Sequence, residues 1–379
     1  MHILRVANFV SPTSGGIKTA LRHWGEVYRE RGHRVSLIIP GPGRAVTQAP
    51  EGMVYRVPAT PIPHTGYSLM WNRAGMSRLM DSIDPDVIEV SDRSTTRWMG
   101  RWARRRGIGS TMISHEHMTG IMVRRTPVPT RPAVWMADVV NRLSADDYDA
   151  IVCPSDFAAQ EFHRNGIPAH VVPLGVDLDV FVPSCEHERI APDGTRRNTD
   201  TMQIVHCGRL APEKNPWLSI QTLRVLVERG IDAHLTVLGH GPLRDDLLEA
   251  SDDLPVAFHS YIHGRAELAT VMGRADVAIA PGPLETFGLA ALEALACGVP
   301  TVCPDEGGLQ EVVGDGGVVA ASDPELFADA VLELIERPGA RQRARTQAEL
   351  FNWQTSGDRM LAIHDGLRVA KHARLRSGS

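Results

Sequence analysis

Two glutamates, Glu285 and Glu293, flank the start of an Ala/Leu-rich segment that the sequence predicts to be a helix. A helix start presents unpaired backbone N–H groups at the positive end of the helix dipole, and together these hold phosphate. Carboxylates repel phosphate but accept hydrogen bonds from hydroxyl groups. The segment therefore favours a ligand with both phosphate and hydroxyl groups, such as a nucleotide-sugar. The alternative is an ordinary helix with a solvated glutamate at each end.

A second loop, Cys207–Pro216, carries Arg209 and Lys214 just before a predicted helix that begins at Pro216. Proline is favoured in the first turn of a helix. Two fixed cations beside a helix start are suited to clamping a diphosphate. An ordinary surface loop explains this segment equally well when it is taken alone, but the Glu285–Glu293 segment favours the clamp.

A glycine pair, Gly15 and Gly16, lies between the first predicted strand and the first predicted helix. Glycines there let the backbone approach a ligand closely at a helix start. The loop lacks both the G-x-G-x-x-G fingerprint and the Walker sequence, which argues against dinucleotide or ATP binding. A plain turn is the alternative.

A histidine pair, His115 and His117, ends another predicted strand. One of these histidines could donate a hydrogen bond to a ligand at the strand end, and a satisfied structural histidine is the alternative. No carboxylate or thiol cluster completes a metal site, so we expect no metal. Three acidic pairs are interpreted as caps and turns: Asp84 with Asp86, Asp147 with Asp149, and Asp177 with Asp179.

The composition is that of a globular protein, with 379 residues and 43% apolar residues. No apolar run reaches the roughly 20 residues that span a bilayer, and the first residues look like a strand rather than a signal peptide. The 5 cysteines are scattered, as expected for a reduced cytoplasmic protein. Residues 1–185 carry 21 basic and 17 acidic side chains within a chain of net charge −5. This basic half favours an anionic partner, with chance as the alternative.

Short apolar runs alternate with amphipathic segments along the chain, which indicates parallel sheets with helices on both faces, an α/β fold. The strands expected in the first half are 3–9, 34–39, 53–57, 87–90, 111–114 and 150–153, and the helices are 20–31, 69–83, 95–106 and 156–165. The strands expected in the second half are 203–207, 234–238, 256–259, 277–280, 301–303 and 317–319, and the helices are 216–229, 242–250, 265–273, 288–297, 308–313 and 324–336.

The polar segment 183–201 is interpreted as a linker, so we expect two doubly wound domains, 1–183 and 184–355. Residues 356–379 are expected to form a C-terminal helix and tail that pack back toward the first domain. Ligands of open α/β sheets bind at the carboxyl ends of the strands, so we expect the site in the cleft between the two domains.

The order of these motifs along the chain resembles the GT-B retaining glycosyltransferases of family 4, over nearly the whole sequence. The motifs that carry the resemblance are Gly15-Gly16, His115, Pro154-Ser155, Pro173-Leu-Gly175-Val-Asp177, Gly208-Arg209 with Glu213-Lys214, Gly239-His-Gly241-Pro242, Glu285 to Glu293, and Gly298-Val-Pro300. Within the family, the chain looks like actinobacterial GDP-mannose-dependent mannosyltransferases of the phosphatidylinositol mannoside pathway. The resemblance implies the GT-B fold, two Rossmann-like domains around a cleft.

The resemblance also implies a role for each motif. Arg209 and Lys214 would bind the diphosphate, and Glu293 the ribose hydroxyls. Glu285 would face the transferred sugar, with backbone amides of Phe287, Gly288 and Leu289 at the phosphate. Gly16 would lie near phosphate or acceptor, His115 at the sugar, and Ile262 at the base. His117 competes with His115 for its role, because the family histidine usually stands without a second histidine two residues on.

The function this implies is transfer of a hexose, mannose from GDP-mannose as first choice, to a lipid-linked acceptor such as a phosphatidylinositol mannoside. Transfer to a soluble acceptor, an inositol phosphate or a growing polysaccharide, is the alternative. A nucleotide-sugar epimerase and a non-catalytic nucleotide-sugar sensor are alternatives of another class. We expect no cofactor, no metal in the catalytic step and no nucleic-acid partner.

An anionic membrane surface is a further expected partner of the first domain, at the inner face of the plasma membrane. Arginines from Arg97 to Arg106 cluster with Trp98 and Trp102, and residues 61–80 are both apolar and basic. Arginine and tryptophan on one amphipathic segment suit the interface of an anionic bilayer. The alternative is a solvated helix whose tryptophans pack inward.

Overall fold

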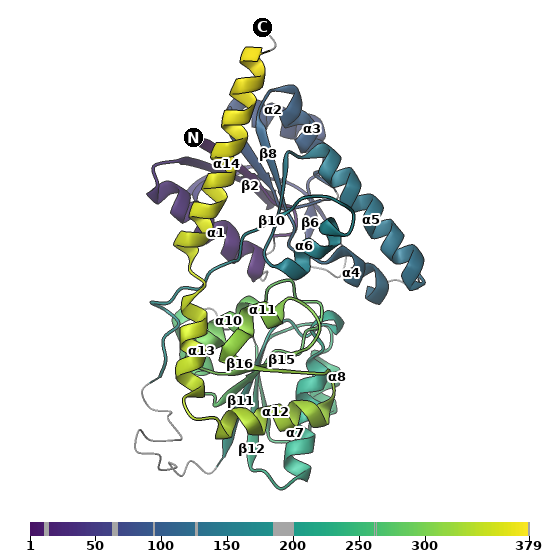
Figure 1. The fold of residues 1–379 in the computed structure, drawn as a ribbon, viewed down its shortest axis with the longest axis vertical. Helices are drawn as coiled ribbons and strands as arrows, with labels where there is room; N and C mark the ends of the chain where they lie inside the picture. The colour runs from purple at the N-terminus through teal and green to yellow at the C-terminus, as the bar shows by residue number, and fades with distance from the viewer. Residues whose placement is uncertain are drawn as a thin grey trace. The chain divides into compact units, whose positions relative to one another are not determined.

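A computed structural model describes residues 1–10, 15–62, 67–93, 95–125, 128–184, 201–260, 262 and 264–377. The chain divides into two compact units (Figure 1), Met1–Leu174 with Trp353–Ser379 (unit 1) and Gly175–Asn352 (unit 2). The boundaries thus lie after Leu174 and Asn352, whereas we expected them after residues 183 and 355. Residues after Leu174 belong to unit 2 because Arg345 holds them: its guanidinium donates to the Phe181 carbonyl oxygen over 2.8 Å.

The unit 1 sheet has eight strands in the order β10-β9-β8-β7-β1-β2-β4-β3, all parallel except β3, which pairs antiparallel with β4. Its strands are β1 (His2–Val6), β2 (Arg34–Gly41), β3 (Ala45–Ala49), β4 (Gly52–Pro58), β7 (Val87–Val90), β8 (Gly109–Ile113), β9 (Ala150–Cys153) and β10 (His170–Val171); β5 (Thr60–Pro61) and β6 (Ser68–Leu69) form a separate pair. The helices are α1 (Gly16–Glu30), α2 (Arg73–Ile83), α3 (Trp98–Arg105), α4 (Met118–Arg125), α5 (Thr130–Asp147), α6 (Asp156–His163) and α14 (Trp353–Ser377).

Helix α2 begins later than the sequence predicts. Leu69 belongs to strand β6, and the Asn72 side chain accepts a hydrogen bond from the Gly75 backbone N–H over 2.9 Å. An asparagine in this position satisfies a donor that a helix start leaves unpaired, so it fixes the first residue of the helix at Arg73. The expected start at residue 69 is therefore wrong.

A buried charged cluster holds α14 to the rest of unit 1, where α14 lies along α1 (Figure 1). The Glu89 carboxylate accepts from the Arg5 guanidinium over 2.6 Å and from the Tyr28 hydroxyl over 2.6 Å. The His364 ring of α14 lies 2.7 Å from the same carboxylate. Burial alone would raise the pKa of Glu89, but Arg5 and His364 lower it to about 2. A buried charge with this many partners fixes the position of each.

The unit 2 sheet has six parallel strands in the order β13-β12-β11-β14-β15-β16. The strands are β11 (Met202–Cys207), β12 (Ala233–Leu238), β13 (Val256–His259), β14 (Val277–Ile279), β15 (Thr301–Pro304) and β16 (Gly317–Ala320). The helices are α7 (Pro216–Glu228), α8 (Arg244–Glu249), α9 (Arg265–Gly273), α10 (Leu289–Ala296), α11 (Leu309–Val313), α12 (Pro324–Glu336) and α13 (Ala340–Glu349), with short 3-10 turns η1 (Pro212–Lys214) and η2 (Gly314–Gly316).

The strand order of unit 2 reverses between β11 and β14, which is the Rossmann arrangement. Ligands of such sheets bind at this reversal, outside the carboxyl ends of the strands. The loops after β11 and β12 meet here: a Cβ at Gly239 would lie 1.9 Å from the Gly208 carbonyl oxygen. Only glycine fits at position 239, and its absence of a side chain lets the two loops pack against each other.

Candidate active site

Lys214 and Glu285 meet at the reversal point of unit 2. The Lys214 ammonium donates a hydrogen bond to the Glu285 carboxylate, which links the loop after β11 to the loop after β14. Both side chains remain accessible, at 31% and 24% exposure. A cation and a carboxylate are therefore paired at the strand-order reversal, where sheets of this kind bind ligands. The sequence motifs predicted that these two residues belong to the same site.

Arg209 lies in the same loop but contacts a different carboxylate. Its guanidinium is 3.9 Å from Glu213, and its side chain is 42% exposed. The loop then turns through η1, and Asn215 adopts a left-handed backbone conformation (φ 47°) that leads into α7 at Pro216. Arg209 and Lys214 thus frame one loop, and of the two only Lys214 has an ion pair to Glu285 among the described residues.

The start of α10 is shaped by its neighbours. Phe287 is buried, with its ring edge-on to Phe351 at 5.7 Å between centroids. Gly288 has a positive φ of 92°, and a Cβ there would lie 2.2 Å from the Leu309 side chain. The Leu309 side chain thus leaves no room for a side chain at position 288, and Leu289 is the first residue of α10. The backbone N–H groups at a helix start are the kind that bind phosphate, so the expected phosphate contact at this end of α10 stays a prediction.

Glu293 is a nearly buried carboxylate whose neighbour is Arg265. The two side chains are 3.6 Å apart, and Glu293 is 14% exposed. Burial raises the pKa of Glu293 to about 7, although Arg265 acts in the opposite direction. Arg265 begins α9, and its guanidinium lies 5.1 Å from the centre of the Phe181 ring.

Arg265 is a candidate residue that sequence reasoning missed. The loop before it contains the partly buried Ile262, the residue expected at the base, and follows β13. An arginine in the first turn of the helix after such a loop is a signal that the sequence does contain. Arg265 therefore links the expected base end of the site to Glu293, the residue expected at the ribose.

In unit 1, the loop Ser114–His117 after β8 is held by a buried arginine. The Arg93 guanidinium donates to the Ser114 hydroxyl, to the Glu116 carbonyl oxygen and to the Asn141 side chain, the last over 2.8 Å. The same guanidinium lies 3.5 Å from Glu161, which is fully buried. Arg93 and Glu161 were not expected from the sequence, because only the fold brings them to this loop.

His115 and His117 have different surroundings. Burial, together with the positive charges of Arg5 and Arg93, lowers the pKa of His115 to about 4, so its imidazole is neutral near pH 7. His117 accepts a hydrogen bond from the Gly120 backbone N–H over 3.0 Å and stacks on Phe157 with 4.5 Å between ring centres. His117 therefore caps α4, and His115 is the better candidate for contact with a ligand.

The loop after β1 places Gly15 and Gly16 at the start of α1, with Gly16 as its first residue. A Cβ added at Gly15 would meet no atom of the described residues within 4 Å. Ser11–Ser14 lie outside the described residues. In the part of the chain that the structure describes, no group of three or more His, Cys, Asp or Glu side chains could hold a metal ion.

The two tryptophans of α3 have different surroundings. Trp102 is 1% exposed and belongs to the core, and Trp98 packs against that core. The Arg106 guanidinium covers the Trp102 ring at 4.5 Å, and Arg97 pairs with Asp147 at 2.9 Å. The expectation of exposed tryptophans is therefore wrong for Trp102, because α3 packs this residue into the core, whereas Trp98 lines an open pocket together with Arg101 and Arg105. His64, another residue expected in this surface, lies outside the described residues.

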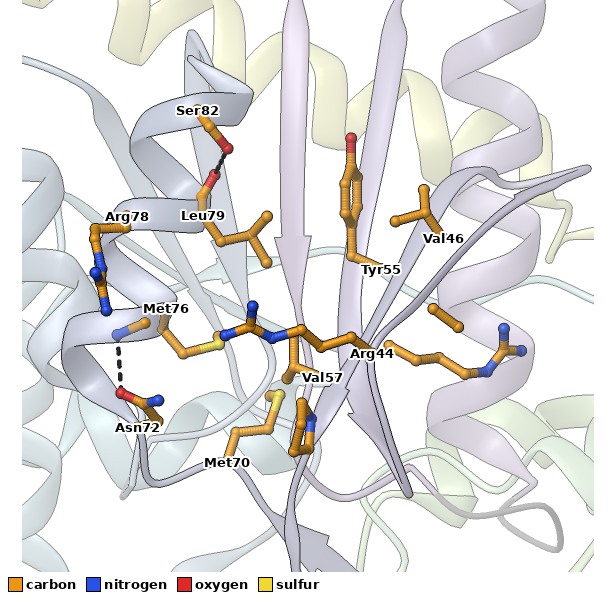
Figure 2. A pocket seen from close by; sticks show the side chains of 14 residues that line it. Arg44, Val46, Tyr55, Val57, Met70, Asn72, Met76, Arg78, Leu79 and Ser82 are labelled. Atoms are coloured by element: carbon orange, nitrogen blue, oxygen red, sulfur yellow. Dashed lines mark hydrogen bonds between the residues drawn. The ribbon is translucent and has the colours of Figure 1, made fainter.

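A cavity of about 460 Å³ opens in unit 1 between α2 and the strands β3 and β4. Figure 2 shows Met76 and Leu79 of α2 on one side and Tyr55 and Val57 of β4 on the other. Among the described residues, three arginines and no acidic residue line the cavity. The lining consists of Arg44, Ala45, Val46, Tyr55, Arg56, Val57, Pro58, Met70, Asn72, Gly75, Met76, Arg78, Leu79 and Ser82. Apolar walls with arginines suit an anionic ligand that has an apolar part.

Two models of glycosyltransferase families match the chain, one in each half of the sequence. Residues 15–175 match the glycosyl transferase 4-like domain, and residues 188–351 match the glycosyl transferases group 1 family. The chain belongs to this glycosyltransferase family and has its GT-B fold.

The relatives include proteins of mycobacteria that match nearly end to end. A GDP-mannose-dependent alpha-(1-6)-phosphatidylinositol dimannoside mannosyltransferase from Mycobacterium tuberculosis is 40% identical over 98% of this chain and 97% of its own length. A GDP-mannose-dependent alpha-mannosyltransferase from Mycolicibacterium smegmatis is 30% identical over 97% of this chain and 98% of its own. A D-inositol 3-phosphate glycosyltransferase from Paenarthrobacter aurescens is 34% identical over 48% of each chain.

Solved structures share the fold at low sequence identity. A sucrose-phosphate synthase from Thermosynechococcus elongatus superposes with a TM-score of 0.76 at 18% identity, covering 98% of this chain and 100% of that one. The Anabaena protein HepE, solved in complex with UDP and glucose, gives a TM-score of 0.71 at 16% identity over 95% of this chain and 98% of its own. In the described residues no helix is both long and apolar enough to cross a bilayer.

Proposed function

We propose that the protein transfers mannose from GDP-mannose to a lipid-linked acceptor of the phosphatidylinositol mannoside type. The observation that carries the proposal is the Lys214–Glu285 pair at the reversal point of unit 2, in a chain 40% identical over 98% of its length to a mannosyltransferase of that specificity. The loop after β11 would bind the diphosphate, and the start of α10 its oxygens.

Catalysis would depend on positive charge that is already in place when the bond between the sugar and the diphosphate breaks. As the bond between sugar and diphosphate breaks, negative charge grows on the diphosphate, and Arg209, Lys214 and the start of α10 stabilise it. The leaving diphosphate then takes the acceptor proton on the same face of the sugar, which retains the anomeric configuration. The step needs no divalent metal.

His115 would serve as a neutral hydrogen-bonding group and not as a cation. Its lowered pKa of about 4 makes the imidazole unprotonated near pH 7. Arg93 and Glu161 hold the loop that carries it, because Glu161 also accepts from the Met118 backbone N–H over 2.8 Å. The neutral ring can therefore bond to a sugar hydroxyl without adding a positive charge to its surroundings.

The cavity beside α2 supports an acceptor that combines an anionic group with an apolar one. Its walls hold apolar side chains such as Met76 and Leu79, and its arginines include Arg44 and Arg78. A phospholipid has a phosphate for the arginines and acyl chains for the walls, whereas an inositol phosphate has no apolar part. We therefore place the enzyme at the inner face of the plasma membrane as a peripheral protein.

A panel of nucleotide-sugars tests the donor. The purified protein is heated with GDP-mannose, GDP, UDP-glucose and UDP, and a ligand that binds only the folded state raises Tm. GDP-mannose should stabilise most, and radiolabelled mannose should then pass to phosphatidylinositol mannosides extracted in detergent. Stabilisation by UDP-sugars alone, sugar turnover without acceptor, or transfer only to inositol phosphate would each contradict the proposal and favour one of the alternatives.

A further inference from the structure

Helix α5 has its side chains arranged in the opposite way to an ordinary surface helix. Its buried residues are small or polar: Ala133, Ala137, Asn141, Ser144 and Asp147. Its outward residues include large apolar ones, with Trp135 64%, Met136 42% and Leu143 41% exposed. A surface helix normally buries its large apolar side chains against the core.

The outward apolar residues form one stripe. Pro132, Trp135, Met136, Val139 and Leu143 recur at the spacing of a single helix face. None of these five residues belongs to the core of unit 1 among the described residues, although Val139 is half-buried, and the opposite face of α5 is held by polar contacts of Asn141 with Arg93 and of Asp147 with Arg97. The stripe, which we call the α5 outer face, is therefore available to a partner.

The charged residues beside the α5 outer face indicate what kind of partner it would bind. Arg131 and Arg142 are exposed beside the stripe. Two of the three acidic residues of α5 are occupied: Asp138 accepts from Arg164 over 2.6 Å, and Asp147 pairs with Arg97; Asp146 is exposed at the C-terminal end. An apolar stripe flanked by arginines matches the interface of an anionic bilayer, where arginine heads lie at the phosphates.

We propose that the α5 outer face inserts into the surface of an anionic bilayer and holds unit 1 there. The helix has 18 residues, so at 1.5 Å per residue it is roughly 27 Å long and would lie in the plane of the interface. This proposal rests on the lipid acceptor proposed above, and it names the surface through which the enzyme reaches that lipid. Figure 1 shows α5 at the periphery of unit 1.

Vesicle binding of the full chain tests the proposal. The outer-face variant Trp135→Ser/Met136→Ser/Leu143→Ser is compared with wild type and with Val319→Ser/Leu326→Ser/Leu350→Ser, a control in unit 2 whose residues are 42%, 46% and 69% exposed. Vesicles contain phosphatidylcholine with or without phosphatidylinositol, at low salt. We expect wild type and control to co-sediment with anionic vesicles, and the outer-face variant to bind at least about tenfold more weakly.

The outcomes separate this proposal from the proposed function. Mannosyl transfer to acceptor in detergent micelles should be unchanged in the outer-face variant, because α5 is not needed once the lipid is dispersed. Equal vesicle binding of the variant and wild type, or no binding by wild type, would overturn the membrane role of α5 while transfer persists. A wild-type dimer that the variant converts to monomer, with vesicle binding unchanged, would assign the face to a second copy instead. Vesicle binding lost by the variant with no transfer by wild type would sink the proposed function alone.

Discussion

Lys214 and Glu285 are 71 positions apart in the sequence and form a salt bridge in unit 2. The contact exists because β14 pairs with β11 in the sheet, so the loops that follow these strands are neighbours. In the proposed function, a diphosphate that enters this site would meet a lysine already held in place by a carboxylate. The carboxylate also keeps a hydrogen-bond acceptor beside the cation, where a sugar hydroxyl can bind.

Removal of either cation should nearly abolish transfer without unfolding the protein. Lys214→Ala and Arg209→Ala each take away a fixed charge that faces the leaving group, and loss of one such donor typically costs about 10²–10³ in rate. Both residues are partly exposed, so Tm should change little. Steady-state transfer rates are compared with those of Arg224→Ala, which removes an exposed arginine paired with Asp253 on the surface of unit 2. Activity within a factor of two of wild type for both variants would refute the clamp.

Substitution of the two histidines in the loop after β8 should have different effects, on catalysis for His115 and on stability for His117. His115→Ala should lower kcat by about 10² or more, as expected for loss of a group at the reacting sugar, with Tm near that of wild type. His117→Ala removes the acceptor for the Gly120 N–H and should cost about 1 kcal/mol of stability, the usual value of a helix cap. Thermal unfolding and kcat are measured on both variants. The reverse pattern would assign His117 to the site.

Glu293 should make the stability of the free protein fall as pH rises. Its pKa is raised to about 7 in the folded protein from the ordinary 4.5, so between these values the folded state holds a proton that the unfolded state has lost. The free energy of unfolding therefore decreases with rising pH across this window. Glu293→Gln lacks this effect and should gain in Tm over wild type more at pH 8 than at pH 5.

The control for this pH series is Glu333→Gln, an exposed glutamate of the same unit at 55% exposure. Its Tm difference from wild type should be nearly the same at both pH values, because its side chain is exposed to solvent. If Glu293→Gln also shows one constant difference, Glu293 is ionised throughout and the burial argument fails.

Transfer should persist in the presence of a chelator. The leaving diphosphate is expected to be stabilised by Arg209, Lys214 and the start of α10, which do the work that a divalent metal does elsewhere. Initial rates are measured after dialysis against EDTA and again after addition of Mg²⁺ or Mn²⁺. Complete loss of turnover that either ion restores would show that a metal takes part.

The elements with a clear apolar period were predictable. Strand β13 and helix α12 have the predicted bounds, because their apolar residues follow the period of a strand or helix that packs on a core. Helix α13 was missed because the residues it buries are only alanines, Ala340, Ala344 and Ala348. Helix α5 was missed although its large apolar residues recur at helical spacing.

The sequence allowed us to predict which residues belong to the candidate site better than which of them contact one another. The types and spacing of Lys214, Glu285 and Glu293 suggested phosphate and hydroxyl binding, but the pairing of Lys214 with Glu285 depends on the strand order of the sheet. Arg93 and Arg265 were missed, since their partners Glu161 and Glu293 are far away in the sequence and only the fold brings them within 3.5 Å and 3.6 Å.

The bond between Glu89 and His364 has a consequence for how the chain folds as it is made. Glu89 leaves the ribosome 275 residues before the histidine that completes its set of partners. At about 5–20 residues per second, roughly 14–55 seconds pass between the two. During synthesis the core of unit 1 is therefore short of one partner, while unit 2, which is continuous in sequence, has all its residues before α14 emerges. Unit 1 is therefore the first unit to be started during translation, but unit 2 is the first whose residues are all synthesised.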